Sequence, residues 1–333
     1  MTLYDVVVVG ATGLVGRKIL EVLEQRSFPV DRIVPVASAR SAGMEIMYKD
    51  HRPKVVELNE AAFVHAEIAF FAAGGDVSKA WVPVAAKHCK VVIDNSSEYR
   101  MHPRVPLVVP EVNPRAMHAA HERIIANPNC STIQLVVALK PLHDAFHIRR
   151  IVVSTYQAVS GAGQRGVAQL SHEIARLPVE NPPFPHAILS NALPQVAMFY
   201  SDGYTKEEYK MIDETRKILG DPLIKVAPTC VRVPVANCHS ESVNVEFEKP
   251  YDIRAVREIL ERAPGVFLVD DPQNSAYPLA THADGRDEVF VGRVRRDESV
   301  ANGLALWIVS DNLRKGAALN AVQIAELWAK GGV

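Results

Sequence analysis

Cys130 is placed where a cysteine could act as a nucleophile. It follows the polar segment Asn127-Pro128-Asn129 and comes shortly before the apolar stretch 133–146, whose spacing predicts a helix. A thiol at or just before a helix N-terminus is stabilised as the thiolate by the partial positive charge of the helix end. Because most cysteines are small buried apolar residues, the position indicates covalent catalysis only in combination with other residues.

A glycine-rich segment near the N-terminus could bind a pyrophosphate. Glycines at positions 10, 13 and 16 lie between an apolar run over 6–9 and an amphipathic stretch with helical spacing. Small residues there let the backbone approach a phosphate, and the helix N-terminus adds partial positive charge. The spacing G-x-x-G-x-x-G is less specific than G-x-G-x-x-G, and a tight turn with close packing is the alternative interpretation. The candidate cofactor-binding residues of this segment are Gly10, Thr12, Gly13, Leu14, Val15 and Gly16.

The segment after the apolar run 33–37 bears on the choice between NAD and NADP. An acidic residue at this point binds the ribose 2′-hydroxyl of NAD, whereas a basic residue suits the additional phosphate of NADP. The chain reads Ser38-Ala39-Arg40-Ser41 and has no carboxylate there. Arg40 with the hydroxyls of Ser38 and Ser41 therefore predicts a 2′-phosphate site and NADP as the cofactor. The alternative is a solvent-exposed arginine in a loop.

Short apolar runs in the first part of the chain predict a parallel sheet. They lie at 6–9, 33–37, 68–72 and 91–93. Helical or loop segments separate them, and strands that are apolar throughout are typical of a sheet covered by helices on both faces. We therefore expect a Rossmann-like, doubly wound α/β domain over residues 1–129.

Residues 130–311 are expected to form a second, α+β domain. Its predicted strands are longer and lie at 150–156, 229–235, 242–247 and 304–309. The run 242–247 alternates apolar and polar residues, as in an antiparallel or mixed sheet with one solvated face. Five prolines over 178–194 predict a loop. The helical pattern over 312–330 could pack on either domain, and we assign a helix over 312–333 to the first.

Composition and charge exclude several classes of function. The 333 residues carry 37 basic and 38 acidic side chains, a net charge of −1, so no overall field attracts nucleic acid or an anionic membrane. No apolar run approaches the roughly 18 residues of a membrane-spanning helix, and the N-terminus has no signal-peptide pattern. The four cysteines form no C-x-x-C pair. We therefore expect a cytoplasmic protein with reduced thiols and no metal site.

Five motifs in order along the chain resemble those of one enzyme family. They are G-A-T-G-L-V-G (10–16), D-N-S-S-E-Y-R (94–100), N-P-N-C-S-T (127–132), Q-A-V-S-G-A-G (157–163) and R-V-P-V-x-x-x-H-S-E-S (232–242). Together they resemble the aspartate-β-semialdehyde dehydrogenase family over nearly the whole chain. The resemblance implies an NADP-dependent, phosphorylating aldehyde oxidoreductase with a glyceraldehyde-phosphate-dehydrogenase-like second domain, and a homodimer.

The reaction that the resemblance implies interconverts aspartyl-4-phosphate and aspartate 4-semialdehyde. It lies on the route to lysine through diaminopimelate, and to methionine and threonine. A thiolate must attack the acyl phosphate, and the resulting thioester must accept a hydride. By resemblance Cys130 is the nucleophile, His239 the acid and base, and Gln157 a substrate-positioning residue beside the thiol. Histidine suits this task because its ordinary pKa lies near working pH.

The resemblance also assigns residues to the substrates. Arg232 matches the residue that binds the substrate α-carboxylate, for which a planar guanidinium is suited. Glu207 matches the partner of the substrate ammonium group. The residues around the transferred phosphate are expected to be Arg100, Asn129 and Lys210. The further residues expected near the cofactor are Ser160 and Gly161 in a flexible loop, and Asn312 at the nicotinamide amide.

Two spacings lead to structural expectations for these residues. Arg232 and His239 are seven apart, which would place them on opposite faces of one continuous strand. We therefore predict a turn or bulge between them that brings both side chains to one pocket. Glu207 and Lys210 are three apart in the helical pattern 206–219 and so share a face, although a solvated ion pair is the alternative interpretation.

Two other functions are compatible with parts of this pattern. N-acetyl-γ-glutamyl-phosphate reductase performs the same chemistry on a longer, acetylated substrate, which has no ammonium group and therefore needs no carboxylate such as Glu207. A non-catalytic relative that binds a dinucleotide is expected to lack the thiol or the base. This chain keeps both Cys130 and His239, so the aspartyl substrate and an active enzyme are favoured.

Overall fold

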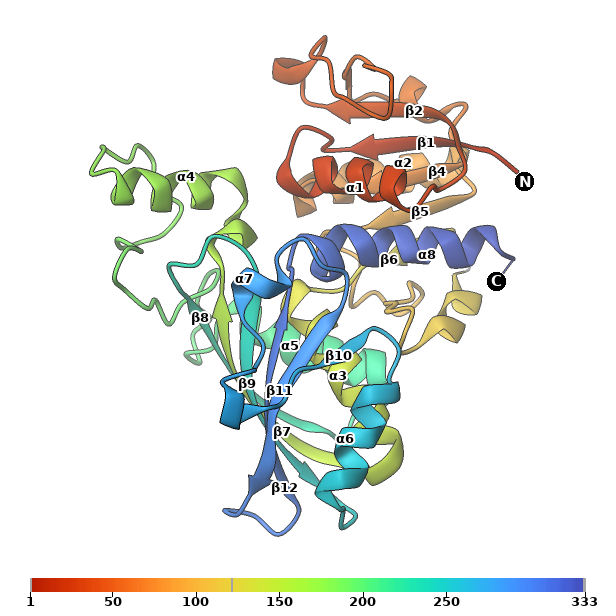
Figure 1. Ribbon diagram of the computed structural model, residues 1–333. Coiled ribbons are helices and arrows are strands. Elements are labelled where there is room, and N and C mark those ends of the chain that lie inside the picture. The colour runs from red at the N-terminus through yellow and green to blue at the C-terminus, as the bar shows by residue number, and fades with distance from the viewer. Residues whose placement is uncertain (1, 121, 332–333) are drawn as a thin grey trace. The chain divides into compact units, whose positions relative to one another are not determined.

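The chain folds into two compact units, each with its own six-stranded sheet. The computed structural model describes residues 2–120 and 122–331, and Figure 1 labels their helices and strands. The first unit contains the chain up to Pro128 together with the segment from Ala317 onward. The second unit contains Asn129–Gly316.

The sheet of the first unit is parallel throughout. Its strands are β1 (Tyr4–Val9), β2 (Val30–Ala37), β3 (Val56–Glu57), β4 (Ile68–Phe71), β5 (Val91–Asp94) and β6 (Ile124–Ala126). They are arranged in the order β3-β2-β1-β4-β5-β6, and every neighbouring pair is parallel. This is the order of a dinucleotide-binding doubly wound sheet, so the predicted Rossmann-like fold is confirmed. The short strands β3 and β6 were not predicted.

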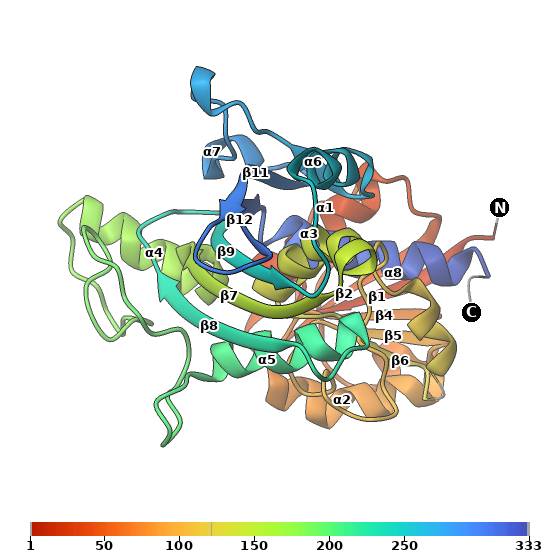
Figure 2. The same cartoon turned by 90° about the horizontal axis from the view of Figure 1, so that it is seen from below.

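Helices cover both faces of this sheet, which explains why its central strands are apolar and buried. Figure 2 shows α1 (Leu14–Gln25) and α8 (Leu319–Ala329) on one side of the sheet and α2 (Gly75–His88) on the other. A π-helical turn over Arg314–Ala318 precedes α8. The helix expected over 312–333 is thus divided, and its last two residues lie outside the described residues.

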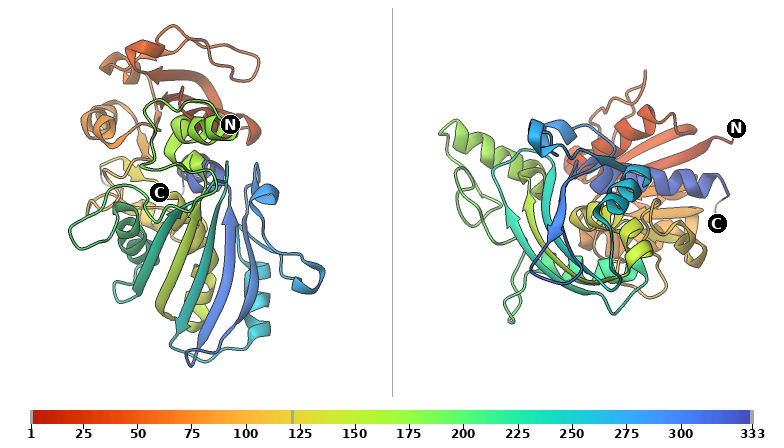
Figure 3. Two further views of the ribbon diagram at one scale, coloured as in Figure 1. Left: turned by 90° about the vertical axis from the view of Figure 1, so that its left-hand side faces the viewer. Right: turned by 60° about the horizontal axis from the view of Figure 1, so that its bottom comes forward.

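The second unit contains a mixed sheet of longer strands. They are β7 (Ile148–Gln157), β8 (Lys225–Arg232), β9 (His239–Phe247), β10 (Val266–Leu268), β11 (Val289–Asp297) and β12 (Gly303–Ser310). Their order is β10-β11-β12-β9-β7-β8. The pairs β7/β8 and β10/β11 are parallel and the other three are antiparallel, so the expected mixed α+β character is confirmed. Figure 3 shows the long strands side by side with a pronounced twist.

The helices of the second unit leave part of this sheet uncovered. They are α3 (Cys130–Phe146), α4 (Gly163–Ile174), α5 (Lys206–Leu219), α6 (Ile253–Arg262) and α7 (Ala280–Ala283). Helix α3 packs on the central strands, and α5 and α6 pack beside it. Along β9 every second residue is buried against these helices and the residues between are half-buried. This confirms the predicted alternation over 242–247.

Short 3₁₀ segments connect several of these elements. They lie at Ala39–Ser41, Glu60–Phe63, Pro114–Ala119, Val159–Ala162 and Pro272–Asn274. No helix in the described part of the chain is both long enough and apolar enough to cross a membrane.

Several strands of the second unit differ from the prediction, and the short strand β10 was not predicted. Strand β8 ends at Arg232 and not at residue 235, because Pro234 has no backbone N–H to donate to a neighbouring strand. Strand β11 was not predicted, since Gly292 and several charged residues interrupt its pattern. A side chain at Gly292 would place its Cβ 2.1 Å from the Val269 carbonyl oxygen, so close packing explains the glycine.

Candidate active site

Cys130 is the first residue of α3 in the second unit. The side-chain oxygen of Asn129 accepts hydrogen bonds from the backbone N–H groups of Ser131 and Thr132, at 3.1 and 3.4 Å, and so caps the helix. No acidic residue occupies the first turn, and the thiol is half-buried. Cys130 therefore lies at the positive end of a long buried helix, as predicted, where a thiolate is favoured.

A buried carboxylate, Glu207 on α5, connects three of the predicted site residues. One oxygen accepts hydrogen bonds from the side-chain amides of Asn129 and Gln157, at 2.8 and 3.0 Å. The other oxygen pairs with the Lys210 ammonium group at 2.8 Å. Burial alone would raise the pKa of Glu207, but Lys210 and the two amides outweigh it and lower the pKa to about 2. Glu207 is therefore ionised at every working pH.

Gln157 lies at the end of β7, next to the ends of two other strands. It is directly opposite Arg232 at the end of β8, and the preceding residue is opposite the second residue of β9. Its amide nitrogen donates to the Ser131 hydroxyl at 2.6 Å as well as to Glu207. Its amide oxygen has no hydrogen-bond partner among the described residues. The amide nitrogen thus fixes the side chain, and the amide oxygen is available to accept a further hydrogen bond.

His239 is the first residue of β9 and is fully buried. The backbone N–H of Ala158 donates to its Nδ1 at 3.0 Å, which assigns the proton of the neutral ring to Nε2. Burial lowers the pKa of His239 to about 3, and the Arg232 guanidinium acts in the same direction. No described residue accepts a bond from Nε2. His239 is therefore a neutral ring with its one N–H donor unused.

Arg232 lies close to His239, because the chain turns between β8 and β9. A Cβ atom at Gly161 would lie 2.7 Å from Arg232 Nη1 and 3.2 Å from His239 Nε2, so both side chains meet beside this glycine. The predicted interruption between the two residues is confirmed. Arg232 Nη1 donates to the Ala158 carbonyl at 2.7 Å, and burial lowers the pKa of the guanidinium.

The loop around Gly161 is tied to Asn312, which follows β12 by two residues. The Asn312 amide nitrogen donates to the Ser160 hydroxyl at 2.9 Å. The Asn312 amide oxygen accepts the backbone N–H of Cys238 at 2.9 Å. Ser160 also donates to Asn237. These bonds hold the loop and the start of β9 together, and so they fix His239 from both sides.

Three residues that contribute to this site were not predicted. Ser131 accepts the bond from Gln157, and Glu214 accepts the backbone N–H of Asn129 at 2.7 Å. Gly316 is needed because a Cβ there would lie 2.9 Å from the Cys130 Cβ. Glu214 lies seven residues after Glu207, and this two-turn spacing on a helix is the one signal in the sequence that could have indicated it.

The glycine-rich turn of the first unit has the geometry of a phosphate-binding turn. A Cβ at Gly10 would lie 2.5 Å from the Ala72 carbonyl oxygen, and one at Gly16 would lie 2.2 Å from the Gly10 oxygen. These two glycines are therefore required by packing at the ends of β1 and β4, where the strand order reverses. Gly13 is the N-cap of α1 and has no side chain to satisfy the helix N–H groups. These groups are left to bind an anion.

The candidate 2′-phosphate residues follow β2 in the first unit. Arg40 is exposed in the segment Ala39–Ser41, and its guanidinium has no hydrogen bond or ion pair with any described residue. No carboxylate lies between Ala37 and Ser41. The turn and the basic side chain together fit a phosphorylated dinucleotide.

Arg100 is also in the first unit, and its side chain is anchored to the backbone. It donates to the carbonyl oxygens of Asn127 and Asn95, at 2.9 and 2.8 Å, and is largely buried. Asn127 precedes Cys130 by three residues. Arg100 therefore holds the chain segment that precedes Cys130.

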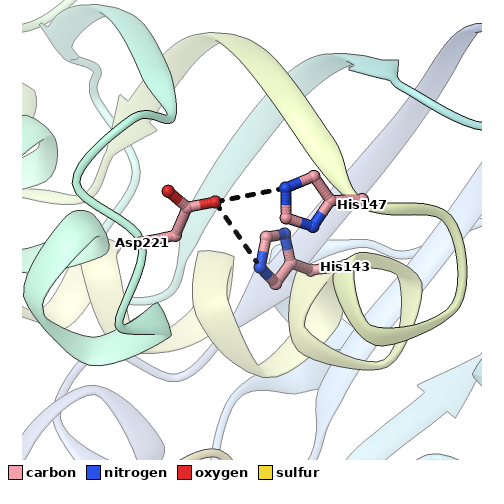
Figure 4. A group of neighbouring side chains, drawn as sticks. All are labelled: His143, His147 and Asp221. Carbon is pink, nitrogen blue, oxygen red and sulfur yellow. Dashed lines mark ion pairs between the residues drawn. The ribbon is translucent and has the colours of Figure 1, made fainter.

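A second group of titratable residues lies at the opposite end of α3. His143 and His147 face Asp221, with Nε2–carboxylate distances of 3.9 and 3.6 Å (Figure 4). The backbone N–H of Ile148 donates to His143 Nδ1 at 3.1 Å, so the proton of the neutral ring is on Nε2. A metal ion would need that atom unprotonated. We therefore interpret the group as a polar cluster in which the neutral His143 ring faces the Asp221 carboxylate, and not as a metal site.

Family models match both parts of the chain. Residues 5–120 match the model described as semialdehyde dehydrogenase, NAD binding domain, and residues 139–315 match semialdehyde dehydrogenase, dimerisation domain. The fold and these matches define an oxidoreductase of the semialdehyde dehydrogenase class.

Curated relatives and solved structures indicate the family within this class. Aspartate-semialdehyde dehydrogenase of Aquifex aeolicus is 54% identical over 99% of both chains. The crystal structure of aspartate semialdehyde dehydrogenase II from Vibrio cholerae has 47% identity, a TM-score of 0.95 and 99% coverage of both chains. That of the Candida albicans enzyme has 25% identity, a TM-score of 0.77 and full coverage. The chain belongs to the aspartate-semialdehyde dehydrogenase family.

Replacing Lys210 by Met should destabilise the protein, because it leaves the Glu207 carboxylate buried without its cation. The expected loss is about 3 kcal/mol at pH 7, measured by urea unfolding. Because folding lowers the pKa of Glu207 from 4.5 to about 2, its stabilising contribution is present above pH 4.5 and is lost as the pH falls toward 2. The difference between wild type and Lys210→Met should therefore shrink over that range.

Two controls accompany this measurement. Lys206→Met changes an exposed lysine on the same helix and should have little effect. The double variant Glu207→Gln/Lys210→Met removes both charges and should recover much of the loss. Equal stability of wild type and Lys210→Met at pH 7 would contradict the role of this pair.

Proposed function

We propose that the chain catalyses the NADP-dependent reductive dephosphorylation of aspartyl-4-phosphate to aspartate 4-semialdehyde, and the reverse reaction. The observation that carries this proposal is Cys130 at the start of a buried helix, together with the hydrogen-bonded set formed by Asn129, Gln157 and Glu207. Synthesis of lysine through diaminopimelate, of methionine and of threonine, and a cytoplasmic location, follow from the same proposal.

Cys130 supplies the covalent step. Its thiolate attacks the 4-carbonyl carbon of aspartyl-4-phosphate, a carbon–sulfur bond forms, and the bond from that carbon to the phosphate oxygen breaks. The phosphate leaves and takes up a proton, and a thioester remains on Cys130. The chemistry that the nicotinamide cofactor supplies when bound is hydride transfer. The carbon–sulfur bond then breaks, which releases the aldehyde and restores the thiolate.

His239 stabilises the oxygen of the reacting carbonyl. Negative charge develops on this oxygen whenever the thiolate or the hydride adds. The neutral ring holds its proton at Nε2 and has no other partner for it among the described residues. Because the pKa of His239 is near 3, the ring donates this hydrogen bond in the neutral form at working pH. We assign the acid role of His239 to this N–H.

Glu207, Arg232 and Lys210 select the substrate. A carboxylate that is ionised at every working pH attracts the free ammonium of an aspartyl substrate, whereas an acetylated amine would leave it without a partner. The guanidinium of Arg232 suits the α-carboxylate, and its Nε has no partner among the described residues. Lys210, Asn129 and Arg100 are proposed to contact the phosphate group.

The proposed NADP preference rests on the first unit. It is supported by the glycine turn, whose helix N–H groups suit the pyrophosphate, and by Arg40 with Ser38 and Ser41, which we propose as the 2′-phosphate site. The Candida albicans structure is one with NADP, which supports the same choice. Ser160, Gly161 and Asn312 are proposed to complete the nicotinamide end.

We propose a homodimer formed through the open face of the second sheet. Tyr156 and Trp307 pack against each other on this face with tilted rings whose centroids are 5.3 Å apart. A hollow of about 370 Å³ lies beside them, lined by Ser240, Ser242 and Tyr277 among others. Aromatic side chains over a hollow of this kind are typical of the centre of a protein interface.

Cys130→Ala should abolish turnover. Wild type is expected to reduce NADP with aspartate 4-semialdehyde only when phosphate is present, followed at 340 nm. The variant should fall by at least about 10³-fold, because no other thiol can form the thioester. Cys89→Ala, which changes a fully buried thiol, should keep its activity. Undiminished turnover of Cys130→Ala would contradict the mechanism, and preference for N-acetylglutamate 5-semialdehyde would transfer the assignment to the acetylated substrate.

Arg40→Ala should weaken NADP binding selectively. Loss of a charged partner of the 2′-phosphate should raise the dissociation constant for NADP by about 10- to 100-fold and change that for NAD by less than about twofold. Isothermal titration calorimetry measures both constants. Arg52→Ala, another exposed arginine of the first unit, is the control. Equal losses for both nucleotides would contradict the proposed 2′-phosphate site.

Trp307→Glu should convert the dimer to monomers. A charge at the centre of an interface must be desolvated without a partner, so we expect the mass measured by light scattering to halve at micromolar concentration. Met101→Glu changes an exposed apolar residue of the first unit and should leave the mass unchanged. A dimeric Trp307→Glu variant would exclude this face as the interface.

A further inference from the structure

A second buried polar pair, Gln134 and Glu241, lies within the second unit just beyond the candidate catalytic residues. Glu241 is two residues after His239 on β9, on the same buried face of the strand. Gln134 is four residues, one helical turn, after Cys130 on α3, and α3 packs on β9. Both side chains are fully buried. The helix that carries Cys130 and the strand that carries His239 therefore each place one polar side chain in the core between them.

In the described part of the chain, neither side chain has a partner of the kind that a buried polar group needs. Both oxygens of Glu241, and both the oxygen and the nitrogen of the Gln134 amide, have no hydrogen-bond partner of normal geometry among the described residues. No described cation pairs with Glu241. The residues opposite it on the neighbouring strands are Thr155 and Ile308, which carry no charge. A carboxylate in this position would have lost its hydration without compensation.

No described titratable group around Glu241 stabilises the ionised form of its carboxyl group. On its own strand His239 is neutral, and on α3 the thiol of Cys130 can only become negative. On β8 the thiol of Cys230 has a pKa that is raised mainly by burial and further by Glu207, Glu208 and Glu241. Burial raises the pKa of Glu241 well above its ordinary value, and only the Gln134 amide opposes this. Burial and the lack of a pairing cation among the described residues therefore both favour the protonated form of this carboxyl group.

A protonated carboxyl and a primary amide are complementary. The carboxyl O–H can donate to the amide oxygen while the amide N–H donates to the carboxyl C=O, which satisfies all the unpartnered polar atoms of this pair except one amide hydrogen. An ionised carboxylate can make only the second of these bonds. The Gln134 amide lies close enough to Glu241 to lower its pKa, so the two side chains are neighbours.

We propose that Glu241 is a positioning residue, which as a neutral acid pairs with the Gln134 amide and ties the Cys130 helix to the His239 strand. This inference rests on the roles proposed above for Cys130 and His239. The pair itself touches no reacting atom. It sets the distance between the thiol and the ring N–H through the two elements that carry them.

The protonation state is tested by stability in the absence of substrate and cofactor. Above pH 4.5 the folded protein retains the Glu241 proton that the unfolded chain releases, so wild-type stability falls as the pH rises. Glu241→Gln keeps an amide that can pair with Gln134 and cannot titrate. Its advantage in the unfolding equilibrium constant should therefore grow by up to about tenfold per pH unit between pH 5 and 8. Glu246→Gln, on the other face of β9, should show no such trend, and a pH-independent difference for Glu241→Gln would overturn the neutral acid.

The positioning role is tested by Gln134→Leu/Glu241→Leu. Apolar residues of similar volume should leave the melting temperature unchanged or higher, so a purely structural pair would leave activity intact. We expect kcat to fall about tenfold with little change in KM, and the apparent pKa of Cys130 alkylation by iodoacetamide to rise. Glu241→Gln should keep both properties within about twofold of wild type. Wild-type kcat and alkylation in the double variant would overturn the positioning role.

These outcomes separate this inference from the proposed function. The unfolding and alkylation measurements require no turnover, so they remain decisive for the pair even if the enzyme uses another substrate. Turnover by Cys130→Ala would instead contradict the proposed mechanism and leave the unfolding result for Glu241 as it stands.

Discussion

The site of the second unit depends on one buried ion pair, Glu207 with Lys210. The carboxylate accepts hydrogen bonds from Asn129, which caps the helix that begins at Cys130, and from Gln157, which ends a strand of the sheet. A neutral residue at position 207 could not accept both amide donors and a cation at once. Because the pair is three residues apart on one helix, α5 holds both members rigidly. The positions of the thiol, the amide and the sheet are thus coupled through a single charge.

Strand topology explains how residues distant in sequence reach this charge. Strand β7 is parallel to β8 and antiparallel to β9, so the end of β7, the end of β8 and the start of β9 lie at one edge of the sheet. Gln157, Arg232 and His239 occupy these three positions. The other residues of these strands belong to the sheet. Along β9, buried residues that face the core alternate with half-buried residues on the other face. A polar side chain at the end of a strand lies at the boundary of the core, where it can contact a ligand.

Local signals made part of this arrangement predictable from the sequence. Helix α5 over 206–219 has a capping box formed by Thr205 and Glu208. Asn129 caps α3 through its side-chain oxygen alone, so the sequence indicates the start of both helices and the place of Cys130. Pro234 indicated the break between Arg232 and His239. Strand β11 could not be predicted, because Gly292 interrupts its pattern for a packing reason that only the fold reveals. Likewise nothing in the order His239-Ser240-Glu241 shows that the carboxyl group is enclosed.

Burial acts on three titratable groups of the second unit with three different results. Glu207 is buried with a cation and two amide donors and stays ionised, with a pKa of about 2. His239 is buried beside a guanidinium and stays neutral. Glu241 is buried with no described cation beside it, and burial raises its pKa. Burial in a low dielectric disfavours charge at all three positions. The neighbouring charges and hydrogen-bond donors therefore determine which of the three side chains stays ionised. The result is one fixed negative charge at Glu207, while burial favours the neutral form of His239 and of Glu241.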